Sequence, residues 1–228
     1  MSEETIVISL GGSLIVPDEV DVDFLRHFKS LIESQVALGK RFMIITGGGK
    51  VCRRYQDSAS KIIKISNKDS DMIGIYTCLL NATLVRVILG DIAYPEVITD
   101  MSKLDDSIIN SVVVLGPNAP GSSSDLGSVQ IADKVGAKKI INLSNIDHVY
   151  DSDPRTNKNA KKLEKVSWAE YRALIPAEWQ PGLSTPFDPV ASKMADEGNI
   201  EVVILNGKNI SNLEQCLNGN DFIGTQIK

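Results

Sequence analysis

Short apolar runs rich in β-branched residues alternate with helical patterns along most of this chain, and this alternation limits the folds it can adopt. Buried strands are expected at residues 5–10, 41–46, 97–99, 112–115, 139–143 and 201–205. Helical spacing of apolar residues occurs at 23–38, 50–63, 70–89, 126–135, 167–174 and 189–197. The alternation predicts a mostly parallel central sheet covered by helices on both faces, which is an α/β fold of three αβα layers.

Length, charge and hydropathy narrow the class of protein further. The 228 residues suffice for one domain with a sizeable core, and we expect a single domain over residues 1–228. A net charge of −5 argues against general binding to a nucleic-acid backbone. No apolar run approaches the roughly 20 residues that span a bilayer, and the acidic N-terminus enters a strand-like run at once, unlike a signal or transit peptide. We therefore expect a cytoplasmic protein without nucleic-acid or membrane partners.

Two glycine clusters follow the first two expected strands, LGGS at 10–13 and TGGGK at 46–50. Glycine lets backbone N–H groups approach phosphate oxygens closely, and ligands of open α/β sheets bind at the carboxyl ends of strands. A helix that begins directly after such a turn adds its N-terminal amides to an anion site. The residues alone leave open whether the clusters bind phosphate or are only tight turns. Neither cluster matches the P-loop or the dinucleotide-binding pattern.

Two polar segments follow later strands. GPNAPGSSSD at 116–125 gathers three serine hydroxyls ahead of a helix, which suits the orientation of a phosphate, although Ser124 or Asp125 could also serve only as a helix cap. SNIDHVYDSDP at 144–154 offers Tyr150 as a face for an adenine ring. In the same segment, Asp147 and Asp153 could accept hydrogen bonds from a ribose or fix a loop. This second segment could equally be a solvated turn.

The ordered set of motifs resembles the amino acid kinase superfamily. The motifs are SLGGS at 9–13, TGGGKVCRRY at 46–55, DMIGIYTCLLNA at 71–82, GPNAPGSSSD at 116–125, SNIDHVYDSDP at 144–154 and FDPVASKMA at 187–195. The late pattern NxDxVYxxDP is specific for the superfamily. Within it, the run 71–82 and the following Ala93-Tyr94-Pro95 are most similar to the short uridylate (UMP) kinases of the archaeal type. The match covers nearly the whole chain.

The resemblance implies an amino acid kinase fold and transfer of the γ-phosphate of ATP to UMP. It implies an acceptor-binding part at about 1–135 and an ATP-binding part at about 136–228. Mg²⁺ would be held through the nucleotide phosphates, with no metal ligated directly by the protein. UMP already carries an anionic phosphate oxygen, so positioning and charge neutralisation are expected to supply catalysis without a strong general base. The family also implies a homo-oligomer, commonly a hexamer assembled from dimers.

Carried over position by position, the resemblance assigns roles to individual residues. The catalytic set is Asp125, Arg53, Gly12 and Gly48, in which Asp125 organises the charged groups around the transferred phosphoryl. The ATP site comprises Gly11, Gly12, Ser13, Gly49, Arg53, Ser144, Asn145, Tyr150 and Asp153. The UMP site comprises Gly48, Asp71, Pro117, Asn118, Ala119, Pro120, Gly121, Ser122, Ser123 and Ser124. Asp71 is expected to hold the ribose of UMP.

The chain departs from the family pattern where cationic groups are expected. Ser9 stands where many superfamily members have a lysine, and Val190 aligns with a second lysine of the acetylglutamate kinases. The candidate replacements are Lys50, Arg53, Arg54 and Lys193, of which the motif favours Arg53. His148 replaces a usual glycine and is expected to be an exposed loop histidine rather than a ligand.

Two other functions stay open. Another small-molecule kinase of the superfamily, of the isopentenyl phosphate or acetylglutamate type, would have the same fold. The former is expected to use a histidine near the acceptor phosphate, for which His27 and His148 are poorly placed. A non-catalytic nucleotide-binding or storage relative would fit the missing lysines, but not the retained glycine clusters and acids. The apolar side of helix 23–38 is a candidate dimer surface, and core packing explains it equally well.

Overall fold

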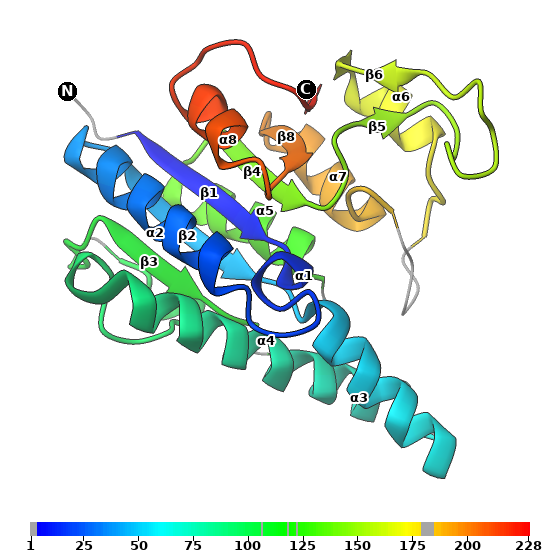
Figure 1. Cartoon of the computed structure of the whole chain (residues 1–228), viewed down its shortest axis with the longest axis horizontal. Coiled ribbons are helices and arrows are strands. Elements are labelled where there is room, and N and C mark those ends of the chain that lie inside the picture. The colour runs from blue at the N-terminus through cyan, green and yellow to red at the C-terminus, as the bar shows by residue number, and fades with distance from the viewer. Residues whose placement is uncertain (1–3, 106, 118, 122, 179–184) are drawn as a thin grey trace.

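A seven-stranded sheet runs through the computed structural model of the chain, which describes residues 4–105, 107–117, 119–121, 123–178 and 185–228 (Figure 1). In spatial order its strands are β3 (Val112–Leu115), β2 (Arg41–Thr46), β1 (Thr5–Leu10), β4 (Lys139–Ser144), β8 (Glu201–Asn206), β9 (Thr225–Ile227) and β7 (Lys165–Val166). The first five are parallel, and β9 is antiparallel to β8. A separate hairpin pairs β5 (Val149–Tyr150) with β6 (Lys162–Leu163).

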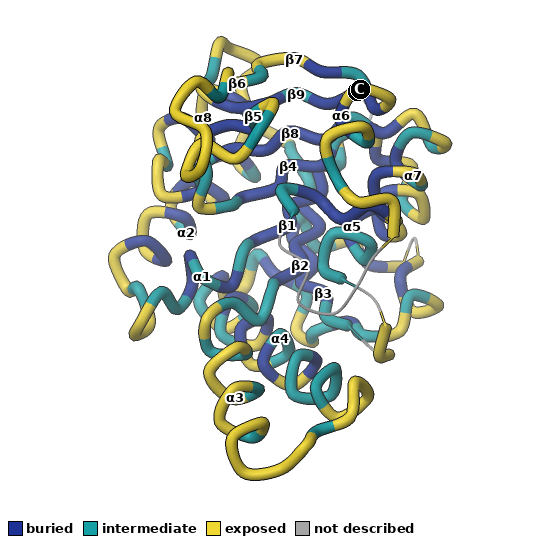
Figure 2. Tube along the Cα trace, turned by 90° about the vertical axis from the view of Figure 1, so that its right-hand side faces the viewer, coloured by how far each residue is buried: buried dark blue, intermediate teal, exposed yellow. Residues whose placement is uncertain are grey.

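Helices cover both faces of this sheet and form three layers with it, as the alternation predicts. One face carries α1 (Gly12–Ile15), α2 (Val22–Ala37), α4 (Asn67–Leu89) and α8 (Ile210–Leu217). The other face carries α5 (Ser124–Val135), α6 (Trp168–Ala173) and α7 (Pro189–Glu197). Short 3-10 turns occur at Gly90–Ile92 and Met101–Lys103. The helix α3 (Gly49–Ile62) extends away from the sheet and is exposed along most of its length (Figures 1 and 2).

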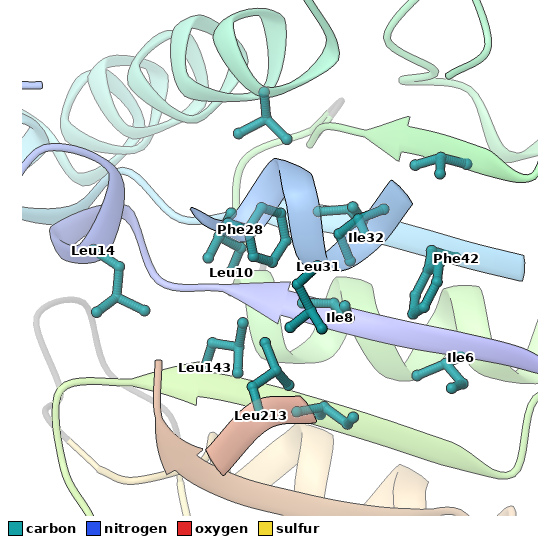
Figure 3. Packing of buried hydrophobic residues seen from close by; sticks show 14 of the residues in the cluster. Ile6, Ile8, Leu10, Leu14, Phe28, Leu31, Ile32, Phe42, Leu143 and Leu213 are labelled. Carbon is teal, nitrogen blue, oxygen red and sulfur yellow. The ribbon is translucent and has the colours of Figure 1, made fainter. Parts of the chain in front are cut away.

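Alternation along β1 divides its side chains between two cores. Ile6, Ile8 and Leu10 point to the α2 side, where they lie near Phe28 and Leu213 (Figure 3). Val7 points to the opposite side and joins the second cluster. Because helices cover both faces, the central strands are buried throughout, which is why their sequences are almost continuously apolar.

The strand expected at 97–99 is wrong as an element. The segment touches β3 only through isolated bridges, from Ala93 to Val112 and from Ile98 to Leu115. Pro95 lies between these two contacts and has no N–H to continue a ladder. The helices α1 and α8 and the short strands β5, β6, β7 and β9 were not expected from the sequence.

Two helices on the same face of the sheet, α2 and α4, differ from what the sequence led us to expect about exposed and membrane-length apolar segments. The apolar positions of α2 are buried in the core, so this helix does not offer them as a dimer surface. The apolar stretch at Asn67–Ile92, which includes α4, contains a window of 18 residues with a mean hydropathy of 1.8, and by length and composition it could cross a membrane. The expectation that no apolar run reaches this length is therefore wrong. Ala82, Val85 and Leu89 of α4 pack into the core beside the sheet.

Candidate active site

The two glycine bends lie in direct backbone contact at the carboxyl ends of β1 and β2. A Cβ atom added to Gly12 would stand 2.2 Å from the carbonyl oxygen of Gly47. One added to Gly49 would stand 2.4 Å from the carbonyl carbon of Gly12, and Gly49 also has a φ of +63°. Any side chain at Gly12 or Gly49 would therefore push the bends apart. Strand β4 also lies against the first bend, because a Cβ atom added to Gly11 would stand 2.8 Å from the carbonyl oxygen of Leu143.

Helices start directly in both bends, so free amides face the space beyond the strands. The helix α1 begins at Gly12, and α3 begins at Gly49. The first N–H groups of a helix have no partner within the helix and favour anions. The preceding amides are used internally, because Gly11 N–H donates to Leu143 and Gly47 N–H donates to Leu10, each at 3.0 Å. The bends thus offer successive donors to a polyanion.

The larger of two cavities at this edge, about 650 Å³, lies over the first bend and β4. It brings together seven residues that the sequence assigned to ATP: Gly11, Gly12, Ser13, Gly49, Arg53, Ser144 and Asn145. It also contains Asp125 and three groups that the sequence analysis missed, Asn142, Thr185 and Pro186. Tyr150 and Asp153 do not line it. The Asp153 carboxylate instead pairs with Arg155 at 2.8 Å and accepts its backbone N–H.

The smaller cavity, about 250 Å³, lies over β2, β3 and α4. The residues assigned to UMP that line it are Gly48, Asp71, Pro117, Ala119, Pro120, Gly121, Ser123 and Ser124. Asn118 and Ser122 lie outside the described residues. The Asp71 carboxylate accepts a hydrogen bond from Gly121 N–H at 3.0 Å, which joins α4 to the 116–125 segment. Ile45, Ile98 and Leu115 give this cavity an apolar floor.

The two cavities meet at the second glycine bend. Gly47, Gly48, Gln56 and Ser124 line both of them. Gln56 of α3 was not singled out from the sequence, and its side chain donates to the Ser70 carbonyl at 3.0 Å, next to Asp71. A group bound in one cavity can therefore reach a group bound in the other at the Gly47–Gly48 peptide. This arrangement suits direct transfer between two ligands.

Arg53 is the one candidate cation that lines the larger cavity within the described chain. Its guanidinium donates to the Ser13 hydroxyl at 3.3 Å, across the first bend. The other three lie elsewhere: Lys50 and Arg54 pair with Asp18 at 3.5 and 2.7 Å, and Lys193 lies 3.9 Å from Glu197. Ser9 is buried in the wall of the cavity, where the missing family lysine would stand.

Asp125 lies in the first turn of α5 but does not cap it. Ser123 is the cap, because its hydroxyl accepts the Leu126 N–H at 3.1 Å. The Asp125 carboxylate instead accepts the backbone N–H of Asp188 at 3.0 Å. Burial raises the pKa of Asp125 to about 7; the Asp188 N–H partly offsets this rise, and the Asp188 carboxyl adds to it. The acid is therefore held in the cavity in a form that can exchange a proton near neutral pH.

Buried polar contacts fix the segment that carries Asp188. The Tyr171 hydroxyl donates to the Phe187 carbonyl and accepts the Phe187 N–H, both at 2.7 Å. From the other side, Asn142 donates to the Pro186 carbonyl at 3.2 Å. These contacts hold Asp188 beside Asp125. No local sequence pattern predicts them.

His148 does not behave as an exposed loop residue, and that expectation is wrong. The ring is buried, and its Nδ1 lies 2.9 Å from the Gly224 carbonyl oxygen. It ties the β5 segment to the chain just before β9 and lines neither cavity.

The chain is similar to known proteins over nearly its full length. The amino acid kinase family matches residues 4–206. A uridylate kinase from Methanospirillum hungatei is 33% identical over 98% of this chain and 94% of its own length. One from Pyrococcus abyssi is 33% identical over 94% of this chain and 95% of its own. The crystal structure of uridylate kinase from Archaeoglobus fulgidus matches with a TM-score of 0.83 and 30% identity, covering 98% of this chain and 99% of that one.

The raised pKa of Asp125 predicts a pH-dependent effect on stability. An aspartate in the unfolded chain has a pKa of about 3.9, so the folded protein holds its proton to higher pH and loses stability as pH rises towards 7. Asp125→Asn keeps an acceptor for Asp188 N–H and cannot ionise. We expect its melting temperature to exceed that of the wild type by a margin that grows from pH 5 to about pH 7 and then levels off.

The control is Asp133→Asn, which removes an exposed carboxylate from the same helix. Thermal melts of the three proteins between pH 5 and 8 provide the comparison. A margin for Asp125→Asn that stays constant over this range would contradict the assignment.

Proposed function

The chain belongs to the amino acid kinase family, and on that premise we propose that it is a UMP kinase, which transfers the γ-phosphate of ATP to UMP and yields ADP and UDP. The observation that carries the proposal is the meeting of two cavities at one glycine bend. The names of full-length archaeal relatives support the same activity. One cavity holds the donor and the other the acceptor, with the reacting phosphates between them.

The larger cavity is the donor site. Amides of Gly12 and Ser13 and the Arg53 guanidinium face the ATP phosphates, and Gly11 lies beside them in the first bend. Ser144 and Asn145 lie at the nucleoside end. Tyr150 and Asp153 are proposed as further nucleoside contacts. Backbone N–H donors suit this role because they bind phosphate oxygens without adding charge that must itself be desolvated. ATP would thus bind over β1 and β4.

The smaller cavity is the acceptor site. The Asp71 carboxylate accepts a hydrogen bond from a hydroxyl of the UMP ribose. The segment 116–124 surrounds the uracil and the phosphate. The apolar floor accommodates the face of a base, and Ser124 lies at the edge shared with the donor cavity. Ser123 lines the acceptor cavity alone. A pyrimidine nucleotide fits this combination of apolar and polar lining.

Mg²⁺ fits the donor site as an ion held mainly by nucleotide phosphates and water. The described residues contain no cluster of three His, Cys, Asp or Glu side chains that could bind it alone, and Mg²⁺ commonly binds through substrate phosphates with few carboxylates. When bound, it supplies positive charge against the γ-phosphoryl group. The residues of the chain hold and orient the two phosphates in line, and Asp125 organises the cationic groups around them.

We expect ATP consumption with Mg²⁺ to depend on UMP. The panel of acceptors is UMP, CMP, isopentenyl phosphate and N-acetylglutamate, because the superfamily includes kinases for the last two. Of the two histidines, His27 bonds along the outer face of α2 and His148 is buried away from both cavities, which disfavours an isopentenyl phosphate kinase. Nucleotide binding without turnover of any acceptor would instead identify a non-catalytic relative.

Asp71→Asn should raise the KM for UMP about tenfold or more, because a charged hydrogen bond to the ribose is weakened. The KM for ATP should change by less than about twofold, since Asp71 lines only the smaller cavity. The matched control is Asp69→Asn, an exposed carboxylate two residues earlier in α4. Steady-state kinetics in both substrates measure the effect. Equal changes in the two KM values would remove the acceptor-site assignment.

We further propose that the protein forms a homo-oligomer, a hexamer assembled from dimers, in which the outer face of α4 makes the contact within each dimer. Tyr76, Leu80 and Val87 follow one another at helical spacing and are 66%, 67% and 53% exposed. No charged residue occurs between Asp71 and Arg86. A second copy of the helix, packed antiparallel, covers such a stripe and brings the Arg86 end near the acidic Asp69 end of its partner.

Leu80→Glu should dissociate the oligomer, because it buries an unpaired charge at the centre of that contact. Light scattering coupled to size-exclusion chromatography gives the mass, and Ile109→Glu is the control, since Ile109 is 92% exposed on a different part of the surface. An unchanged mass for Leu80→Glu would exclude this face as the interface.

A further inference from the structure

Asn81 is a buried amide in the middle of an apolar helix. Its side chain is 3% exposed, and its neighbours on the inner side of α4 are Ala82 and Val85. Burying an amide is unfavourable unless its polar atoms find partners. Thr77, one turn earlier, satisfies its hydroxyl within the same helix by donating to Ile73 at 2.7 Å. Asn81 instead reaches out of the helix.

The partner of Asn81 is the glycine bend between the two cavities. The Asn81 Nδ2 donates to the carbonyl oxygen of Gly47 at 2.8 Å. Just before the bend, the Thr46 hydroxyl donates to the Cys78 carbonyl of the same helix at 2.9 Å. Two hydrogen bonds therefore attach the end of β2 to α4. The Gly47 N–H is held from the other side by Leu10 of β1.

The bond to Gly47 also sets the direction of the next amide. In a trans peptide the carbonyl of one residue and the N–H of the next lie in one plane and point in opposite directions, and the described chain contains no cis peptide. With the Gly47 carbonyl turned to Asn81, the Gly48 N–H points away from it. Gly48 lines both cavities.

Three consecutive glycines need such a constraint. Glycine loses more conformational freedom on folding than any other residue, and a peptide between two glycines can turn over with little steric hindrance. The sequence TGGG provides close approach but does not fix the orientation of the Gly47–Gly48 peptide by itself. An external hydrogen bond to that peptide is the means by which the fold selects one orientation.

We propose that Asn81 is a positioning residue for phosphoryl transfer, which fixes the Gly47–Gly48 peptide so that the Gly48 N–H faces the phosphate at the junction of the two cavities. The role rests on the proposed kinase activity. Asn81 itself touches neither ligand, because it lines neither cavity. Its contribution is to the orientation of a donor, which affects catalysis more than ligand affinity.

Two substitutions test this role. Asn81→Asp has nearly the same shape but lacks the donor, and Asn81→Leu places an apolar side chain of similar size in the same surroundings. We expect kcat to fall about tenfold in each, the rate equivalent of one lost hydrogen bond. The KM for ATP should change by less than about threefold.

Asn212→Asp is the matched control. Asn212 is another buried asparagine whose Nδ2 donates to a backbone carbonyl, that of Ile223 at 2.7 Å, and it lies outside both cavities. This variant should lower the melting temperature and leave kcat unchanged. If both Asn81 variants lose melting temperature in the same way and keep kcat within about twofold of the wild type, Asn81 is only structural and the proposal is overturned.

A second measurement separates this inference from the activity itself. The backbone amide signal of Gly48, followed by NMR while inorganic phosphate is added, should shift in the wild type and shift much less in Asn81→Leu. Equal shifts in the two proteins would overturn the proposal even if turnover of UMP had failed. Absence of UMP turnover in a wild type that shows the expected difference in shift would count against the kinase function alone.

Discussion

The close approach of two glycine bends is the constraint on which the rest of the site depends. Gly12 and Gly49 touch each other's backbone so closely that even a methyl group would separate them. This contact is possible because β1 and β2 are adjacent and parallel, with Leu10 paired to Thr46 at their ends. Free amides that follow two strands therefore converge on one point. They can bind a polyanionic ligand through donors that carry no net charge.

Elements distant in sequence keep this contact in place. Helix α4 holds the second bend through Thr46 and Gly47, and its N-terminal part carries Asp71 to the smaller cavity. On the other face of the sheet, Tyr171 fixes Phe187 and thereby sets Asp188 against Asp125. Both supports rely on buried hydrogen bonds, which are costly to leave unmade and therefore define one arrangement. These contacts hold the backbone at the junction of the two cavities.

The sequence predicts those parts of the molecule whose causes are local. Buried parallel strands such as 41–46 are apolar throughout, and the glycine bends stand at their ends, so fold and phosphate site could be inferred together. The strand at 97–99 failed because Pro95 interrupts the pairing, an effect that propensity alone does not weigh. The cap by Ser123 is local, but the run of three serines and an acid does not show which of them caps the helix. The burial of His148 and the bond from Asn81 depend on contacts across the fold. No window of sequence contains them.

Under the proposed function, the charge of the larger cavity explains how a chain with Ser9 in place of the family lysine holds a polyphosphate. Within the described lining, Arg53 is the only cation and Asp125 the only acid, and burial keeps the pKa of that acid near 7. An acid with a raised pKa repels an approaching phosphate less than a carboxylate with an ordinary pKa does. The remaining attraction comes from neutral amides and from charge that arrives with the nucleotide. Under the proposed function, positioning by backbone donors therefore matters more than charge supplied by lysine side chains, and catalysis depends on the residues that orient the bends.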